Sequence, residues 1–254
     1  MKIVVIGATG LVGTQLVSRL QRAGHAVVSG SRSHGIDAVS GAGIAEAVAG
    51  ADAVVDVMNV REHDGDEARR LFVEASTKLL RAEAEAGVRH HILLSLVGVE
   101  RAGGHGYFRA KAAQEEAVER AGVPFTVLRA TQFFEFAHQI AAWNTVDDTV
   151  RLPARAMRPV ASGDVAAALV DLTGSAPVDG AVEIAGPEII PLDDFVRRVL
   201  LKDHDERYVF TAADAEPIGF NLDGELLLPG PGANLSPTTL DSWLHRAHVD
   251  ARVA

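Results

Sequence analysis

Short runs of aliphatic residues alternate, over the first 130 or so positions, with longer stretches in which apolar residues recur every three or four positions. The short runs predict strands and the longer stretches predict helices. The expected strands are 2–7, 25–30, 51–57, 89–97 and 124–130, and the expected helices are 11–23, 43–49, 66–87, 108–121 and 132–143. The strands are nearly continuous in Val, Ile and Leu, which is typical of strands buried on both faces. The pattern therefore predicts a doubly wound α/β fold with a parallel sheet.

The alternation becomes less regular after about residue 144. A strand is expected at 180–186, a helix that opens at Pro191, and a last helix at 236–247. We expect one domain at 1–150 and a small C-terminal substrate-binding lobe at 151–254, packed on the first domain and interleaved with it.

Three glycines follow the first expected strand in "IGATGLVG", at positions 7, 10 and 13, where the next helix opens. Glycine permits the tight turn and lets the backbone approach a pyrophosphate closely. The helix N-terminus adds free N–H groups and a partial positive charge. A glycine triplet alone also fits a structural turn, but here it begins a βαβ unit. It predicts a Rossmann-type dinucleotide-binding domain.

The end of the second expected strand indicates which dinucleotide binds. An acidic residue there holds the ribose 2′-hydroxyl of NAD, whereas an arginine suits the 2′-phosphate of NADP. The chain reads "VVSGSRSHG", with Arg32 between Ser31 and Ser33 and no Asp or Glu from Val27 to Gly35. A solvated surface arginine is the other interpretation of Arg32. The missing acid favours NADP (NADPH).

Ser95, Tyr107 and Lys111 form the candidate catalytic set. Ser95 falls at the end of the fourth expected strand, where ligands bind in parallel sheets. Tyr107 and Lys111 are one helical turn apart, and the chain has only two tyrosines and four lysines. A lysine ammonium and an oxidised nicotinamide would lower the tyrosine pKa from its ordinary value of about 10. Tyr107 could then exchange a proton with a substrate oxygen that Ser95 binds.

These motifs, with "RATQFFEF", resemble the short-chain dehydrogenase/reductase superfamily in its atypical, NmrA-like branch. The similarity extends through "RPVASGDVAAAL" and "VEIAGPEIIPLDDF", where that branch builds its substrate lobe. It implies a hydride transfer in which Tyr107 is the acid or base, while Lys111 also contacts the nicotinamide ribose. It implies cofactor contacts from Gly7, Thr9, Gly10, Leu11, Val12, Gly13, Ser31, Arg32, Met58, Asn59, Lys111, Ala130 and Thr131.

The aromatic run "QFFEF" supplies Gln132, Phe133 and Phe136 as candidate walls of an apolar pocket over the nicotinamide. Ordinary core packing is the alternative for these rings. The substrate is expected to be a small hydrophobic or aromatic molecule. The histidines, such as His90 and His91, lack partners at ligand spacing, so no metal site is expected.

Composition excludes several classes of function. The net charge is −10 and the basic residues are scattered, so no nucleic-acid partner is expected. The N-terminal apolar run is too short for a signal peptide, no segment is long enough to span a bilayer, and a cytoplasmic protein is expected. Three functions stay open: an NADPH-dependent reductase of a carbonyl or quinone-like molecule, a non-catalytic NADP(H)-binding regulator, and an NADP-dependent isomerase or epimerase.

Overall fold

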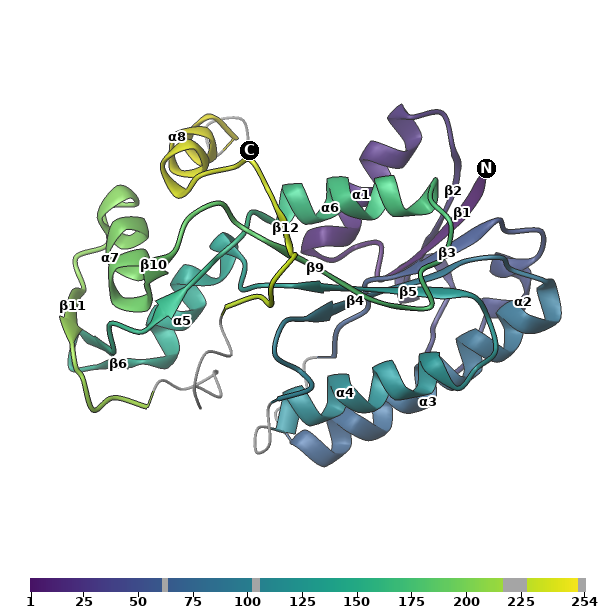
Figure 1. Ribbon diagram of the computed structural model, residues 1–254, viewed down its shortest axis with the longest axis horizontal. Coiled ribbons are helices and arrows are strands. Elements are labelled where there is room, and N and C mark those ends of the chain that lie inside the picture. Colours follow the sequence, from purple (N-terminus) through teal and green to yellow (C-terminus); the bar gives the residue numbers. More distant parts are fainter. Residues whose placement is uncertain (61–63, 102–105, 217–227, 251–254) are drawn as a thin grey trace. The chain divides into compact units, whose positions relative to one another are not determined.

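The computed structural model describes residues 1–60, 64–101, 106–216 and 228–250 (Figure 1). The chain divides into two compact units. The first comprises Met1–Arg129 and Val165–Val182, and the second comprises Ala130–Asp164 and Glu183–Ala254. Neither unit is continuous in the sequence: the chain enters the second unit after residue 129, returns to the first for 165–182 and then joins the second again. The sequence predicts two interleaved parts, and the boundary expected at residue 150 lies inside the segment 130–164, which belongs to the second unit.

The first unit is built on parallel strands, all of which the sequence predicts to within two residues. They are β1 (Lys2–Ile6), β2 (Ala26–Gly30), β3 (Ala53–Asp56), β4 (His91–Leu96) and β5 (Phe125–Ala130). The sheet order is β12-β9-β5-β4-β3-β1-β2, where β9 is Gly180–Ala185 and β12 is Asn234–Leu235. Ile3, Val4 and Val5 are fully buried, as a strand covered on both faces requires.

Helices cover both faces of this sheet (Figure 1). α1 (Leu11–Arg22) and α6 (Ser162–Thr173) lie on one face, and α3 (Gly65–Ala86) and α4 (Gly106–Glu119) lie side by side on the other. The short α2 (Ile44–Val48) packs with α3 in one apolar cluster. The predicted doubly wound α/β fold is confirmed.

No strand forms between β2 and β3. The chain there makes a 3₁₀ turn, η1 (Arg32–His34), then turns at Gly41 and Gly43, which both have positive φ angles, and enters α2. The two left-handed glycines prevent this segment from continuing as an extended strand. β2 is therefore the edge strand of the sheet.

The second unit has its own core. A 3₁₀ turn, η2 (Phe134–Phe136), leads into α5 (Ala137–Trp143), so only part of the helix expected at 132–143 is α-helical. The remaining elements are β6 (Thr145–Val146), β7 (Thr149–Leu152), β8 (Ala156–Met157), β10 (Ile190–Pro191), α7 (Leu192–Lys202), β11 (Tyr208–Thr211) and α8 (Leu240–Asp250). Phe134, Ile140, Phe195 and Leu240 are central to the buried cluster that these elements enclose.

The last helix begins four residues later than the sequence predicts. The segment before it runs through β12, and Thr238 is fixed by its N–H and hydroxyl, which both donate to the Asp164 carboxylate. Within the described residues, no helix combines the length and apolar character that a membrane crossing needs.

Candidate functional site

The glycine turn after β1 fits closely against its neighbours. Gly7 has φ +84°, and a Cβ there would lie 2.8 Å from the carbonyl carbon and oxygen of Val57. A Cβ on Gly13 would lie 2.1 Å from the Gly7 oxygen. The start of α1 therefore lies so close to the end of β1 that a side chain at either position would collide with backbone.

The start of α1 presents its backbone to the carboxyl edge of the sheet. Leu11, Val12 and Gly13 form its first turn, where the N–H groups have no acceptor within the helix. Gly10 precedes them without a side-chain cap, and Thr9 and Gly10 are exposed. This arrangement suits an anionic group such as a pyrophosphate, because the helix end carries partial positive charge. The residues present therefore fit a dinucleotide.

The strand register aligns the other predicted residues along this edge. Ile6 pairs with Gly30 on β2 and with Asp56 on β3, and Asp56 pairs with Leu93 on β4. Gly7, Ser31 and Met58 therefore follow strand ends at about the same level. Ser95 lies two residues beyond that level on β4.

Arg32 begins η1 directly after β2. Its side chain is exposed, and among the described residues it has no ion pair or hydrogen-bond partner. Ser31 Oγ lies 2.8 Å from Ser33 Oγ and 2.6 Å from His34 Nδ1. His34, which the sequence analysis did not single out, thus adds a polar ring to the group. The guanidinium remains available for a phosphate.

Ser95 is 5% exposed, and its hydroxyl has no hydrogen-bond partner among the described groups. A buried hydroxyl without a partner costs free energy, so such a group in a folded protein invites a functional explanation. Thr131 Oγ1, in the second unit, is likewise buried without a partner.

Tyr107 lies on the first turn of α4. Its hydroxyl donates to Asn59 Oδ1 at 2.9 Å, and its ring stands edge-on to Phe72 with centroids 6.1 Å apart. Burial raises the pKa of Tyr107 to about 12, although the hydrogen bond to Asn59 lowers it in part. The expected lowering of the tyrosine pKa by Lys111 is therefore not present in this structure.

Lys111 follows one turn later and points into the interior. Its Nζ donates to the Leu94 carbonyl at 2.9 Å and to Gln114 Oε1 at 2.5 Å, and it lies 4.9 Å from the centroid of the Phe72 ring. Burial lowers the Lys111 pKa to about 8, against the opposing effect of the Asp56 and Glu115 carboxylates. Tyr107 and Lys111 thus contact the same Phe72 ring, but each has a separate polar partner.

The starts of α3 and α4 are held together by two glycines. A Cβ on Gly106 would lie 2.6 Å from the Gly65 Cα, and one on Gly65 would lie 2.4 Å from the Gly106 Cα. This close approach fixes the first turn of α4, which carries Tyr107, against the first turn of α3. No spacing pattern in the sequence predicts this contact, because the two glycines are 41 positions apart.

The predicted nicotinamide and pocket residues belong to the second unit. Thr131 N–H donates to the Ile184 carbonyl at 3.1 Å, just after Ala130 ends β5. Gln132 and Phe133 are half-buried, and the rings of Phe133 and Phe136 lie 6.0 Å apart. Phe136 also packs against the buried cluster of this unit. Their role as pocket walls stays a prediction.

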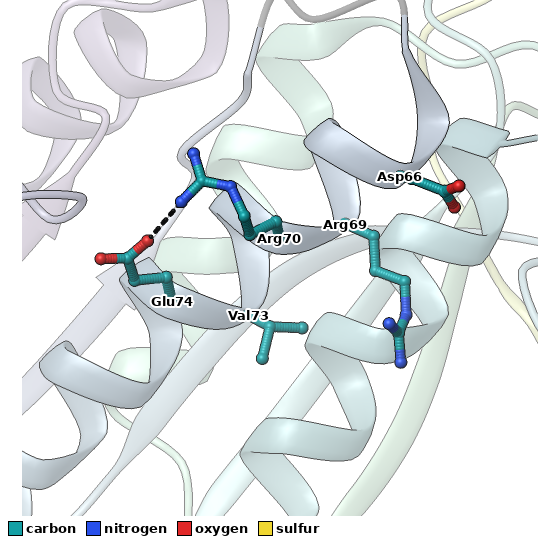
Figure 2. Close-up of a pocket in the computed structure, with 5 residues that line it drawn as sticks. All are labelled: Asp66, Arg69, Arg70, Val73 and Glu74. Atoms are coloured by element: carbon teal, nitrogen blue, oxygen red, sulfur yellow. Dashed lines mark hydrogen bonds and ion pairs between the residues drawn. The ribbon is translucent and has the colours of Figure 1, made fainter.

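Two further polar pairs are formed by neighbouring histidines of the first unit. His91 Nδ1 bonds the Glu83 carboxylate at 2.9 Å, and His90 Nε2 bonds Thr126 Oγ1 at 2.9 Å. In the described part of the chain, no group of three or more His, Asp or Glu side chains could hold a metal ion. A surface depression, shown in Figure 2, is lined by Asp66, Arg69, Arg70, Val73 and Glu74. All five come from α3, so it contains none of the predicted site residues.

Comparison with known proteins agrees with this geometry. Residues 7–175 match the family described as NAD(P)H-binding. Over 207 residues the chain is 31% identical to the (4-alkanoyl-5-oxo-2,5-dihydrofuran-3-yl)methyl phosphate reductase of Streptomyces griseus, with 74% of this chain and 69% of the relative covered.

Solved structures share the fold. The dTDP-4-dehydrorhamnose reductase of Bacillus anthracis in complex with NADP is 12% identical, with a TM-score of 0.73 over 98% of this chain and 99% of that one. The UDP-N-acetylglucosamine 4-epimerase of Bacillus cereus is 15% identical, with a TM-score of 0.73 over 99% of each chain. The resemblance predicted from the sequence is confirmed in its family and fold: the chain belongs to the NAD(P)H-binding family and is an NAD(P)-dependent enzyme of the oxidoreductase type.

Proposed function

We propose that the chain is an NADPH-dependent reductase of a small hydrophobic carbonyl or quinone-like substrate. The observation that carries the proposal is the buried Ser95 hydroxyl, which lacks a partner at the carboxyl edge of the sheet. Lys111 donates to the carbonyl of Leu94, the residue before Ser95, and Tyr107 lies in the first turn of the helix that also carries Lys111. NADPH, when bound, supplies the hydride.

Tyr107 suits the role of proton donor in the reductive direction. Reduction of a carbonyl requires a protonated group to give its proton to the developing alkoxide. Burial raises the Tyr107 pKa to about 12, so the phenol keeps its proton at neutral pH. The hydroxyl would exchange its bond to Asn59 for one to the substrate oxygen. Ser95 would donate a second hydrogen bond to the same oxygen.

Arg32 supports the preference for NADPH. The exposed guanidinium follows the end of β2, and no carboxylate occupies the segment that would bind a ribose 2′-hydroxyl. Arginine pairs with phosphate through charge-assisted hydrogen bonds. Ser31, Ser33 and His34 add polar groups beside it.

The substrate class rests on the reductase relative and on the aromatic residues of the second unit. The relative is named for a phosphate ester that carries an alkanoyl group. In this chain Gln132, Phe133 and Phe136 supply one amide and two half-buried rings, which suit a molecule with an apolar part next to its carbonyl.

The cofactor preference is tested by titrating NADPH and NADH by calorimetry into the wild-type protein and Arg32→Ala. We expect tighter NADPH binding in the wild type. Loss of a charged contact of about 1.5–3 kcal/mol should weaken NADPH binding in the variant by roughly tenfold to a hundredfold and leave NADH binding unchanged.

Arg69→Ala is the matched control, because Arg69 is also exposed and no ion pair holds it among the described residues. It should leave both affinities unchanged. Equal wild-type affinities for the two cofactors, or an Arg32→Ala variant that binds NADPH normally, would contradict the assignment.

A further inference from the structure

We propose that Gln114 is the positioning residue for Lys111: its carboxamide, held in one orientation by Asp56 and Ser76, keeps the lysine ammonium on the Leu94 carbonyl at the end of β4. The proposal rests on the proposed function in one respect, which is that Lys111 takes part in the reaction. The positioning itself can be measured without cofactor or substrate.

The hydrogen bonds of Gln114 fix which way its amide faces. Nε2 donates to Asp56 Oδ2 at 3.2 Å and to Ser76 Oγ at 3.1 Å, while Oε1 accepts from Lys111 at 2.5 Å. The Met58 N–H donates to the other Asp56 oxygen at 2.9 Å, so both oxygens act as acceptors, as in a carboxylate. An ammonium has only donors and a carboxylate only acceptors. A flipped amide would therefore lose both of these partners.

The group is buried within the first unit, between the sheet and the two helices α3 and α4. Gln114 and Ser76 are 0% exposed, Asp56 is 1% and Lys111 is 3%. Each partner comes from a different element: Asp56 from β3, Ser76 from α3 and Leu94 from β4. A buried hydrogen bond to a charged group is costly to leave unmade. The lysine is therefore confined to one position.

The charges that face Lys111 favour the ammonium form. Asp56 and Glu115 are the carboxylates that act on it, and the face of Phe72 is a further favourable contact for a cation. His91 lies within the electrostatic influence of Asp56, and Glu83 pairs with His91. The ammonium donates one hydrogen bond to the Leu94 carbonyl and one to the Gln114 side-chain oxygen. Removing the Gln114 oxygen takes away a contact that stabilises the ammonium, so the lowering of the Lys111 pKa by burial should become larger.

This arrangement ties the lysine to the predicted reaction edge. Leu94 directly precedes Ser95 on β4, so the Lys111–Leu94 bond holds the ammonium at a fixed place beside the strand that carries the unpartnered hydroxyl. Gln114 is fully buried, and its side-chain hydrogen bonds go to Lys111, Asp56 and Ser76. It acts through Lys111, which makes it a positioning residue.

The test is an NMR titration of the lysine side chains. The chain has four lysines, so protein labelled isotopically at lysine gives few signals, and Lys111→Met identifies the one that belongs to Lys111. In Gln114→Met, which keeps the side-chain length and removes the acceptor, we expect the Lys111 pKa to fall by about one unit or more. Ser76→Ala is the control: Asp56 still orients the amide, so the pKa should change by less than half as much.

Gln114→Glu is the conservative variant. A glutamate can accept from Lys111 as a carboxylate, or as a carboxylic acid that donates to Asp56, so the Lys111 pKa should equal or exceed the wild-type value. Non-specific loosening of the core would instead move the pKa in the same direction in both Gln114 variants.

The proposal would be overturned by an unchanged Lys111 pKa in folded Gln114→Met. It would also be overturned by a lowered Lys111 pKa in Gln114→Glu, and this second measurement decides the question if Gln114→Met fails to fold. With a substrate, the fall of kcat at high pH should begin at a lower pH in Gln114→Met than in the wild type. If the enzyme shows no turnover, the proposed function fails while the titration still decides the role of Gln114.

Discussion

Among the individual residues, Glu83 and His91 form a fully buried pair inside the first unit. Burial lowers the His91 pKa, but the Glu83 and Asp56 carboxylates raise it more, so it lies above the ordinary value of 6.5. The folded protein therefore holds a proton that the unfolded chain releases above this pH. The contribution of His91 to stability is complete below about pH 6.5 and is lost as the pH rises through the folded-state pKa.

The raised His91 pKa predicts how the free energy of urea unfolding depends on pH. From about pH 6.5 upward the free energy of unfolding of the wild type should fall through this pair, because the folded protein loses the proton that stabilises it. Glu83→Gln removes the charge that raises the His91 pKa, so its stability should be lower at pH 6 but should change less over the same range. Glu85→Gln, at an exposed position on the same helix, should keep the wild-type slope. A Glu83→Gln slope equal to that of the wild type would contradict the assignment.

The sequence predicts the residue types of the candidate site better than their partners. The four-residue spacing of Tyr107 and Lys111 is a local feature, and the structure shows both at the start of α4 in contact with Phe72. Their hydrogen-bond partners include Asn59, 48 positions from Tyr107. Asp56, which orients Gln114, is 58 positions from it. Contacts between residues so far apart in the sequence depend on the packing of β3, α3 and α4, which the spacing of residues does not reveal.

Among the elements, the β1–α1 turn depends on glycine at two positions to different degrees. A Cβ on Gly13 would lie 2.1 Å from backbone, whereas the nearest atom to a Cβ on Gly10 is the Gly7 oxygen at 3.3 Å. Gly10 also has φ −81°, which other residues adopt without strain. The two positions therefore form a matched pair for substitution.

We expect Gly13→Ala to lower the free energy of unfolding by about 1–3 kcal/mol or more, because backbone must move to admit the methyl group. Gly10→Ala should cost less than about 1 kcal/mol, as for a helix cap that exchanges glycine for alanine. Thermal or urea unfolding of the two variants without cofactor measures the difference. Equal destabilisation would show that α1 does not approach β1 as closely as described.

Element boundaries follow from the sequence where a short aliphatic run forms the element. β1, β3, β4 and β5 are largely buried and the edge strand β2 only in part, yet all five aliphatic runs end close to the observed strand ends. The last helix starts at Leu240 instead of 236, because Ser236 N–H pairs with the Ala185 carbonyl and Thr238 binds Asp164. Those bonds hold the preceding segment in a non-helical conformation, and no periodicity in the sequence encodes them.

For the whole molecule, the sequence predicts two parts but not how the chain divides between them. The segment 130–164 leaves the first unit and joins the second, and 165–182 returns. The sequence predicts that the two parts are interleaved, but the expected boundary at residue 150 does not coincide with any of the positions at which the chain passes between the units. The family and fold follow from motifs that lie in the first unit, whereas the predicted pocket residues, Gln132, Phe133 and Phe136, lie in the second.

The proposed function depends above all on Tyr107, which would donate the proton in an NADPH-dependent reduction. The most direct measurement follows NADPH consumption by the wild type and Tyr107→Phe with a panel that contains ketones, quinones and the substrate for which the Streptomyces griseus reductase is named. With an accepted substrate, the account predicts that Tyr107→Phe lowers kcat by about 10²–10⁴-fold while NADPH affinity stays within about twofold. Near-normal kcat in Tyr107→Phe would contradict it.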